Sequence, residues 1–187
     1  GCTDNAEQIA FRRGAIEAWL LENHISLDDL SAVVIRSSGA GLCKKGGTYL
    51  VTGKLRDGMY AAYRGSFPKA PHPSFIVLPL ADEILGSRPI PIYIVDPDGV
   101  DEFQDVAYIT GHPDLPRSSG FHVLNHKAIA RKASRDLGKR YEDADLVVAH
   151  MGGGISIAAH RHGMVVDSTS GGSAGEGPFG TNRTGPL

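Results

Sequence analysis

Hydrophobic and polar residues alternate along the chain in two patterns, one helical and one typical of buried strands. Short apolar runs bounded by glycine, proline or polar residues predict strands at 32–35, 48–51 and 91–95. Helical spacing predicts helices at 4–22, 54–63, 76–85, 100–109 and 121–140, and Ser26 is a candidate cap for a short helical turn. This alternation of strands and helices over the first three-quarters of the chain predicts an α/β fold.

Glycine and proline modify three of these elements. Gly58 is expected to interrupt the helix at 54–63, and Pro79 argues against a regular first turn in the helix at 76–85. Three prolines in residues 67–73 predict a loop there.

The last part of the chain changes character near Ala144. Short apolar runs at 146–149, 155–159 and 164–167 predict a meander of three strands, with His160–His162 as an exposed hairpin tip. Ten of the chain's 24 glycines lie between 152 and 185, and three of them are consecutive. A turn of this kind can take positive φ and approach a phosphate closely, but a plain hairpin with a glycine-rich turn fits the local pattern equally well.

Net charge, cysteine spacing and the chain ends add three expectations. A net charge of −2 gives no electrostatic reason to expect binding to nucleic acid or to an anionic membrane. Cys2 and Cys43 lack metal-ligand or CxxC spacing, which predicts free thiols in a reducing cytoplasm. The chain starts without methionine and ends inside a loop-rich motif, which predicts a fragment truncated at both ends.

Three charged residues stand at positions suited to ligand binding. Asp96 ends an apolar strand immediately before Pro97, and Arg36 directly follows the strand at 32–35. Ligands bind at the carboxyl ends of strands in α/β sheets, although a turn acid or a helix cap would explain Asp96 as well. Arg183 lies in a glycine-rich loop, and taken alone either arginine could be a solvated surface charge.

A pair of histidines, His122 and His126, is spaced four residues apart on a predicted helix and therefore shares one face. The pair could suggest zinc, but the glutamate of an HExxH motif and a recognisable third ligand are both missing from the pattern. A histidine that packs or caps a helix N-terminus remains an alternative explanation for His126.

Five segments occur in an order and spacing that resemble the acetate/butyrate kinase family, and its butyrate branch in particular. They are IPIYIVDP (90–97), VDEFQDVAYITGHP (100–113), FHVLNHKAIARK (121–132), YEDADLVVAHMGGGIS (141–156) and GEGPFGTNRTG (175–185). The resemblance implies an actin-like, ribonuclease H-related ATPase fold. Residues 1–143 would form a nearly complete first domain without its N-terminal phosphate hairpin, and residues 144–187 would open the second domain.

The same resemblance implies a function and its residues. The expected reaction transfers the γ-phosphoryl group of ATP to butyrate or a similar short-chain acid, with Mg²⁺, in a cytoplasmic protein that is a homo-oligomer when complete. Asp96 would organise metal and substrate, and three further residues would contact the phosphoryl group and substrate: Arg36, His122 and Arg183. The nucleotide would be held by His150, Gly152, Gly153, Gly154 and Glu176.

The chain departs from the family pattern in several places. The first phosphate hairpin and the adenosine-binding region are absent, and Ser37–Gly41 replaces an expected double-glycine loop. Phe75 and Ile76 follow Ser74 where the family has smaller residues, which would narrow the acyl pocket. An alternative prediction is therefore a catalytically inactive fragment or degenerate homologue that binds at most nucleotide or a partner chain.

Overall fold

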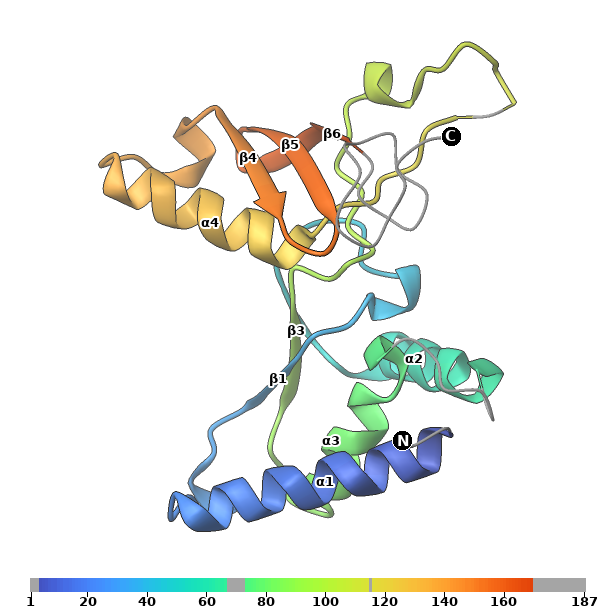
Figure 1. Ribbon diagram of the computed structural model, residues 1–187, viewed down its shortest axis with the longest axis vertical. Coiled ribbons are helices and arrows are strands. Elements are labelled where there is room, and N and C mark those ends of the chain that lie inside the picture. Colours follow the sequence, from blue (N-terminus) through green and yellow to red (C-terminus); the bar gives the residue numbers. More distant parts are fainter. Residues whose placement is uncertain (1–3, 67–72, 115, 170–187) are drawn as a thin grey trace. The chain divides into compact units, whose positions relative to one another are not determined.

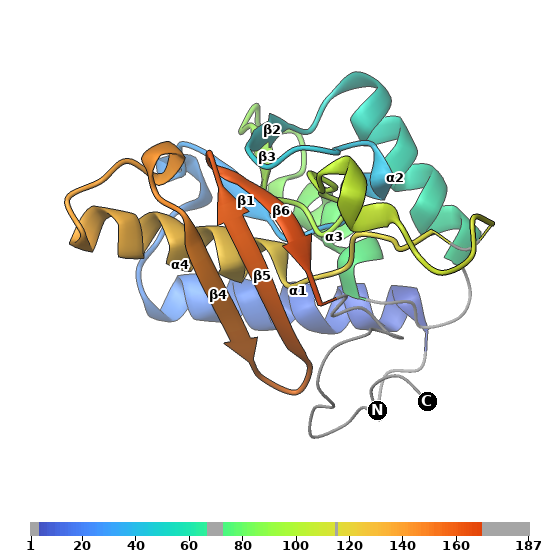
Figure 2. The same ribbon diagram turned by 90° about the horizontal axis from the view of Figure 1, so that it is seen from above.

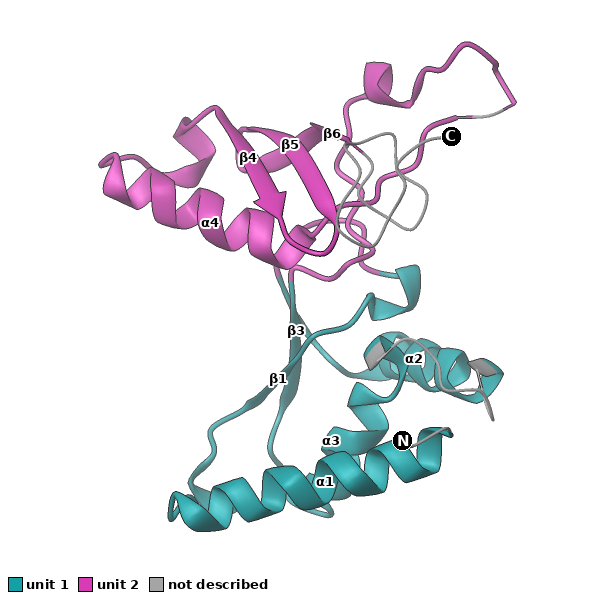
Figure 3. Cartoon of the chain, viewed as in Figure 1, with its two compact units in different colours: residues 1–42, 48–95 teal, residues 43–47, 96–187 magenta. Residues whose placement is uncertain are grey.

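The computed structural model describes residues 4–66, 73–114 and 116–169 (Figures 1 and 2). The chain divides into two compact units, coloured separately in Figure 3: residues 1–42 with 48–95, and residues 43–47 with 96–187. Two of the predicted site residues, Glu176 and Arg183, lie outside the described residues.

In its described residues, the first unit combines a three-stranded sheet with three α-helices. Its strand order is β1-β3-β2, with β1 parallel and β2 antiparallel to the central strand. The strands are β1 (Val33–Ile35), β2 (Thr48–Leu50) and β3 (Ile92–Val95), and the helices are α1 (Asn5–Glu22), α2 (Gly53–Ser66) and α3 (Val77–Leu85). The predicted strands and helices of this part are confirmed.

Helix α1 begins where the sequence predicts. Asp4 caps it by accepting a hydrogen bond of 2.8 Å from the Glu7 amide. Ile9 is buried, but Trp19 is 55% exposed within the described chain. The helix therefore buries only part of its apolar face in this structure.

Two predicted irregularities are wrong. Gly58 does not interrupt α2, and a Cβ at this position would lie 2.8 Å from Cδ1 of Leu42, so the exposed leucine side chain would have to shift. Pro79 is the third residue of α3, where an amide has no acceptor within the helix, so its missing N–H does no harm.

The segment after Arg36 forms a tight left-handed turn. Gly39, Ala40 and Gly41 have φ values of 61°, 52° and 72°. The buried Ser37 hydroxyl accepts a hydrogen bond of 3.2 Å from the Gly39 amide. Arg36 is thus an exposed residue between the end of β1 and a locally defined turn.

The second unit packs helix α4 against an antiparallel meander (Figure 2). The elements are α4 (Val123–Asp136), β4 (Leu146–Met151), β5 (Ile155–Arg161) and β6 (Met164–Ser168). The helix is shorter than predicted because it starts after His122 and ends at Asp136, just before Gly138, which takes a φ of 68°. The three predicted strands are confirmed.

The predicted helix at 100–109 is wrong. Only a 3₁₀ turn forms, at Asp105–Tyr108. The buried apolar residues of this segment have helical spacing, which explains the prediction: Val100, Phe103 and Ala107. The backbone of this segment instead forms hydrogen bonds with distant residues. The Gln104 amide, for example, donates to the Val166 carbonyl at 3.1 Å.

The predicted exposure of the hairpin tip is wrong at one residue. His160 is 1% exposed and belongs to β5. The turn itself consists of His162 and Gly163, with φ values of 52° and 74°. Paired positive φ values match the twist of a two-residue hairpin turn. Among the described residues, no helix is long and apolar enough to cross a membrane.

Candidate active site

Asp96 lies where the chain leaves β3. Its φ is 42°, a conformation that aspartate tolerates better than most residues, and the residue is 1% exposed. The Gly47 amide donates to Oδ1 at 2.9 Å, and the Asp96 amide donates to the Gly47 carbonyl at 2.8 Å. This reciprocal pair fixes the direction of the carboxylate.

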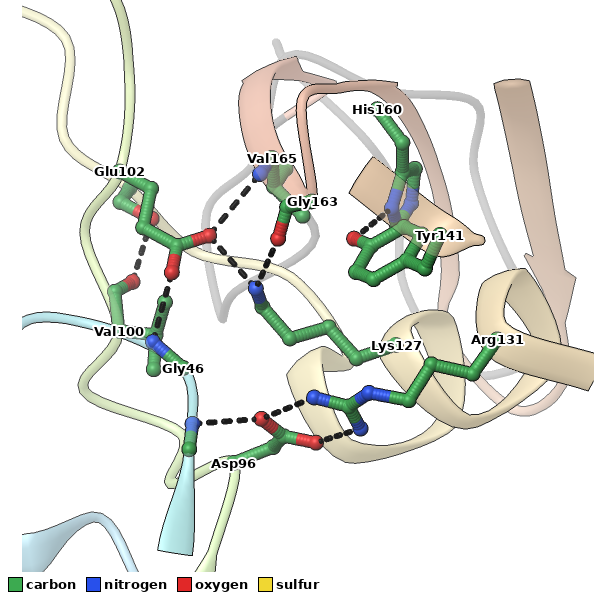
Figure 4. A network of polar contacts seen from close by, with 12 residues as sticks. Gly46, Asp96, Val100, Glu102, Lys127, Arg131, Tyr141, His160, Gly163 and Val165 are labelled. Atoms are coloured by element: carbon green, nitrogen blue, oxygen red, sulfur yellow. Dashed lines mark hydrogen bonds and ion pairs between the residues drawn. The ribbon is translucent and has the colours of Figure 1, made fainter. Parts of the chain in front are cut away.

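Both carboxylate oxygens of Asp96 are also bound by Arg131 of α4 (Figure 4). Nη1 lies 2.5 Å from Oδ2, and Nη2 lies 3.1 Å from Oδ1. The hydrogen bond to Asp96 raises the pKa of Arg131 above its usual value. A two-pronged guanidinium–carboxylate pair is a strong, directional contact, and it spans 35 residues of sequence.

A second ion pair, between Glu102 and Lys127, is almost completely buried (Figure 4). The charged atoms are 2.7 Å apart, and the side chains are 4% and 2% exposed. The Gly46 amide donates to Oε1 of Glu102 at 2.6 Å, and the Val165 amide donates to Oε2 at 2.9 Å. A Cβ at Gly46 would lie 2.5 Å from Nζ of Lys127, so glycine is needed beside this pair.

The buried His160 contacts Tyr141 (Figure 4). The tyrosine hydroxyl lies 2.7 Å from Nδ1 of His160. Burial, and then the charge of Glu102, raise the pKa of Tyr141. Burial, and then the neighbouring His126 and Lys127, lower the pKa of His160 to about 4. Both side chains are therefore neutral at pH 7.

His122 and His150 stack face to face beside the glycine turn. Their ring centroids are 3.8 Å apart with an angle of 9° between the planes. Asn125 holds the second ring, because its Nδ2 lies 2.8 Å from Nδ1 of His150. Two residues expected near the nucleotide or its phosphates, His122 and His150, thus lie together in one unit.

Ser156 of β5 contacts two histidines, His122 at the N-cap of α4 and His126 within that helix. Its hydroxyl lies 2.8 Å from Nδ1 of His122 and 2.8 Å from Nε2 of His126. Ser156 and His126 are both 0% exposed. Burial, followed by the charges of His150 and His122, lowers the pKa of His126 to about 4.

The glycine turn connects β4 to β5, with Met151 paired to Ile155. The Gly152 amide donates to the Gly154 carbonyl at 3.1 Å, inside the turn. The expectation of positive φ is wrong at Gly152. Gly152 instead makes room for the His150 ring, because a Cβ at this position would lie 2.8 Å from Nε2 of His150.

Comparison with known proteins connects this arrangement to one family. Residues 112–187 match the acetokinase family. The chain is 41% identical over 183 residues to a probable butyrate kinase of Clostridium botulinum (strain Alaska E43 / Type E3), and 40% identical over 183 residues to butyrate kinase 1 of Clostridium acetobutylicum. Over residues 112–187 the chain is therefore similar to the acetokinase family. Each alignment covers 97% of this chain but 49% of the relative, so the chain spans about half the length of these relatives.

Comparison with solved structures identifies the fold of the chain. A propionate kinase from Francisella tularensis matches with a TM-score of 0.61 at 19% identity, covering 84% of this chain and 41% of that one. An acetate kinase from Porphyromonas gingivalis matches with a TM-score of 0.60 at 22% identity, covering 78% and 37%. The predicted actin-like ATPase fold is thereby confirmed. The domain boundary near Ala144 stays a prediction.

The structure brings some of the predicted site residues together. His122, His150 and the glycine turn adjoin in the second unit, which also contains Asp96. Arg36 belongs to the first unit. Sequence reasoning missed four residues that hold these side chains or the loops around them: Glu102, Lys127, Arg131 and Ser156. In the described part of the chain, no cluster of three or more histidine, cysteine, aspartate or glutamate residues could hold a metal ion.

The two buried neutral histidines should make this unit sensitive to acid. Their pKa values fall from 6.5 to about 4 on folding, so between these values the unfolded chain binds protons that the folded chain does not. Stability is complete above pH 6.5 and declines as the pH falls toward 4, by at most about 1.4 kcal/mol per pH unit for each histidine. Denaturant unfolding followed across this range measures the slope.

A substitution at His160 distinguishes its contribution to the acid sensitivity from that of His126. His160→Asn keeps an acceptor near the Tyr141 hydroxyl but does not titrate, so it should reduce the acid slope. His162→Asn, at the exposed tip of the same hairpin, should leave the slope unchanged. Equal slopes in the wild-type protein and the His160→Asn variant would contradict the assignment.

Proposed function

We propose that the complete protein is a carboxylate kinase, which transfers the γ-phosphoryl group of ATP to butyrate or a similar short-chain acid and releases ADP. The observation that carries this proposal is the 41% identity, over 97% of this chain, to a relative named as a probable butyrate kinase. The histidine pair beside the glycine turn supports it, because the turn and its flanking residues form part of the family resemblance. A cytoplasmic homo-oligomer is part of the same proposal.

In the proposed reaction a carboxylate oxygen attacks the γ-phosphorus while the bond to the β–γ bridging oxygen breaks. Charge spreads over the equatorial oxygens of the moving group, so catalysis consists of positioning and charge stabilisation. His122 would donate a hydrogen bond to that group, and the glycine turn would lie against phosphate. Arg36 and Arg183 would provide guanidinium donors, and Glu176 would line the nucleotide site.

The role of Asp96 in metal binding depends on Arg131. Mg²⁺ bound with ATP would neutralise charge on the phosphates. In the arrangement described here the Asp96 side chain is 0% exposed, and both its oxygens are bound by Arg131. Asp96 could therefore bind a metal ion directly only if Arg131 released its carboxylate. Its role in the proposal is to hold Arg131 and the loop at Gly47.

Trapping of acyl phosphate tests the proposal. The complete protein is incubated with ATP, Mg²⁺ and hydroxylamine, together with butyrate, acetate or no acid, and acyl hydroxamate is measured. We expect product that requires both ATP and acid, with butyrate turned over faster than acetate. Folded, complete protein that forms no hydroxamate but binds ATP in calorimetry would replace this proposal with the non-catalytic alternative.

A further inference from the structure

We propose that Ser156 and His126 are positioning residues, which keep the proton of His122 on Nε2 when that ring is neutral and make its Nδ1 an acceptor for the Ser156 hydroxyl. The tautomer follows from the hydrogen bonds alone. Its consequence for catalysis rests on the function proposed above.

The geometry places one hydroxyl between two imidazoles. Oγ of Ser156 lies 2.8 Å from a nitrogen of His122 and 2.8 Å from a nitrogen of His126. The backbone amide of His122 also donates to this oxygen, at 3.4 Å. A serine hydroxyl has one proton and two lone pairs, so it can donate to only one of the two rings and must accept from the other.

Two arrangements satisfy this count. In the first, Nε2–H of His126 donates to Ser156, and the serine proton goes to Nδ1 of His122. In the second, Nδ1–H of His122 donates to Ser156, and the serine proton goes to Nε2 of His126. Neutral His126 then carries its own proton on Nδ1.

The surroundings of His126 favour the first arrangement. Its Nδ1 is buried and has no hydrogen-bond partner among the described residues. The second arrangement would bury an unsatisfied N–H there, whereas the first leaves only an unused lone pair. Phe121 meets the His126 ring at 86°, with centroids 5.5 Å apart, so an aromatic side chain forms part of the ring's environment. His126 therefore serves as a donor toward Ser156.

The consequence for His122 concerns its other nitrogen. With Nδ1 occupied as an acceptor, the ring carries its proton on Nε2, on the side away from Ser156. Stacking on His150 at 3.8 Å restrains the plane of the same ring. A donor with fixed position and tautomer requires no reorganisation as charge develops on a phosphoryl group.

The test reads the tautomer directly. The complete protein is labelled with ¹⁵N-histidine, and long-range ¹H–¹⁵N correlations are recorded at neutral pH, with His122→Asn used to assign the signal. We expect the wild-type protein to show only the Nε2–H form of His122. Ser156→Ala should give a mixture of tautomers and lower kcat by about 10- to 100-fold, with a smaller change in KM for ATP.

Ser134→Ala is the matched control. Ser134 is also 0% exposed, but its hydroxyl donates to the Ala130 carbonyl within α4 and contacts neither histidine. This variant should keep the His122 signal and kcat. His126→Gln can still donate an amide proton toward Ser156, so it should retain the Nε2–H form, while His126→Phe should lose it.

Two results would overturn the inference. One is a wild-type His122 that carries its proton on Nδ1, an observation that needs no variant to fold. The other is a folded Ser156→Ala protein with unchanged tautomer and kcat. Failure to form acyl phosphate in the wild-type protein would contradict the proposed function instead, and the tautomer measurement would still decide the inference.

Discussion

Lys127→Met is expected to destabilise the second unit by about 3–5 kcal/mol, because it leaves the Glu102 carboxylate buried without its cation. The two charged groups are 2.7 Å apart and at most 4% exposed. Two backbone amides that donate to Glu102 keep the carboxylate in place, so it cannot turn outward to find water. Native-state hydrogen exchange at amides of α4 and β5 measures the loss of unfolding free energy.

The same helix provides a matched control. Lys132 pairs with Asp136 at 2.9 Å, but these side chains are 64% and 65% exposed. Lys132→Met should therefore change the unfolding free energy by less than about 1 kcal/mol. Similar losses from both substitutions would show that the buried pair has no special structural role.

The buried pair also shows where sequence reasoning stops. Apolar periodicity and turn residues predicted every helix and strand described here, together with one helix that does not form. At 100–109 the apolar spacing suited a helix, but Glu102 and Gln104 bind partners on distant segments. A local sequence pattern does not reveal such hydrogen bonds to distant segments, which compete with the hydrogen bonds of a helix.

Recognition of the candidate site was similarly incomplete. His122, His150 and the three glycines were recognisable because they lie in contiguous motifs. Ser156 stands in one of those motifs, directly after Gly154-Ile155, but its link to His122 crosses 34 residues. Arg131 is one of several basic residues on a predicted helix, where a solvent-exposed charge is the usual expectation. Only the tertiary fold reveals that its guanidinium binds Asp96.

His160 was misjudged for a related reason. Its neighbours at the end of a strand are polar, which is typical of a hairpin tip. In the folded unit the ring is 1% exposed and lies against Tyr141, which follows α4 in the chain. Alternation along β5 would have placed it on the same face as the buried Ser156 and Ala158, four and two residues earlier.

His122→Asn is expected to lower kcat for acyl phosphate formation by about 100- to 1,000-fold, the usual effect of removing one donor aimed at developing charge. The fold should survive, because His122 is the N-cap of α4 and makes no side-chain capping bond there. Asparagine is among the preferred N-cap residues, so the helix should be at least as stable. Steady-state kinetics and thermal unfolding of the complete protein measure the two effects separately.

His162→Asn controls for the chemical change itself. His162 is exposed and has a φ of 52°, and an Asn-Gly pair suits its two-residue turn. This variant should keep both kcat and thermal stability. A folded His122→Asn protein with the kcat of His162→Asn would remove His122 from the proposed mechanism. If His122→Asn lost kcat but kept its thermal stability, His122 would act as a donor in the reaction and not only as a support for the helix.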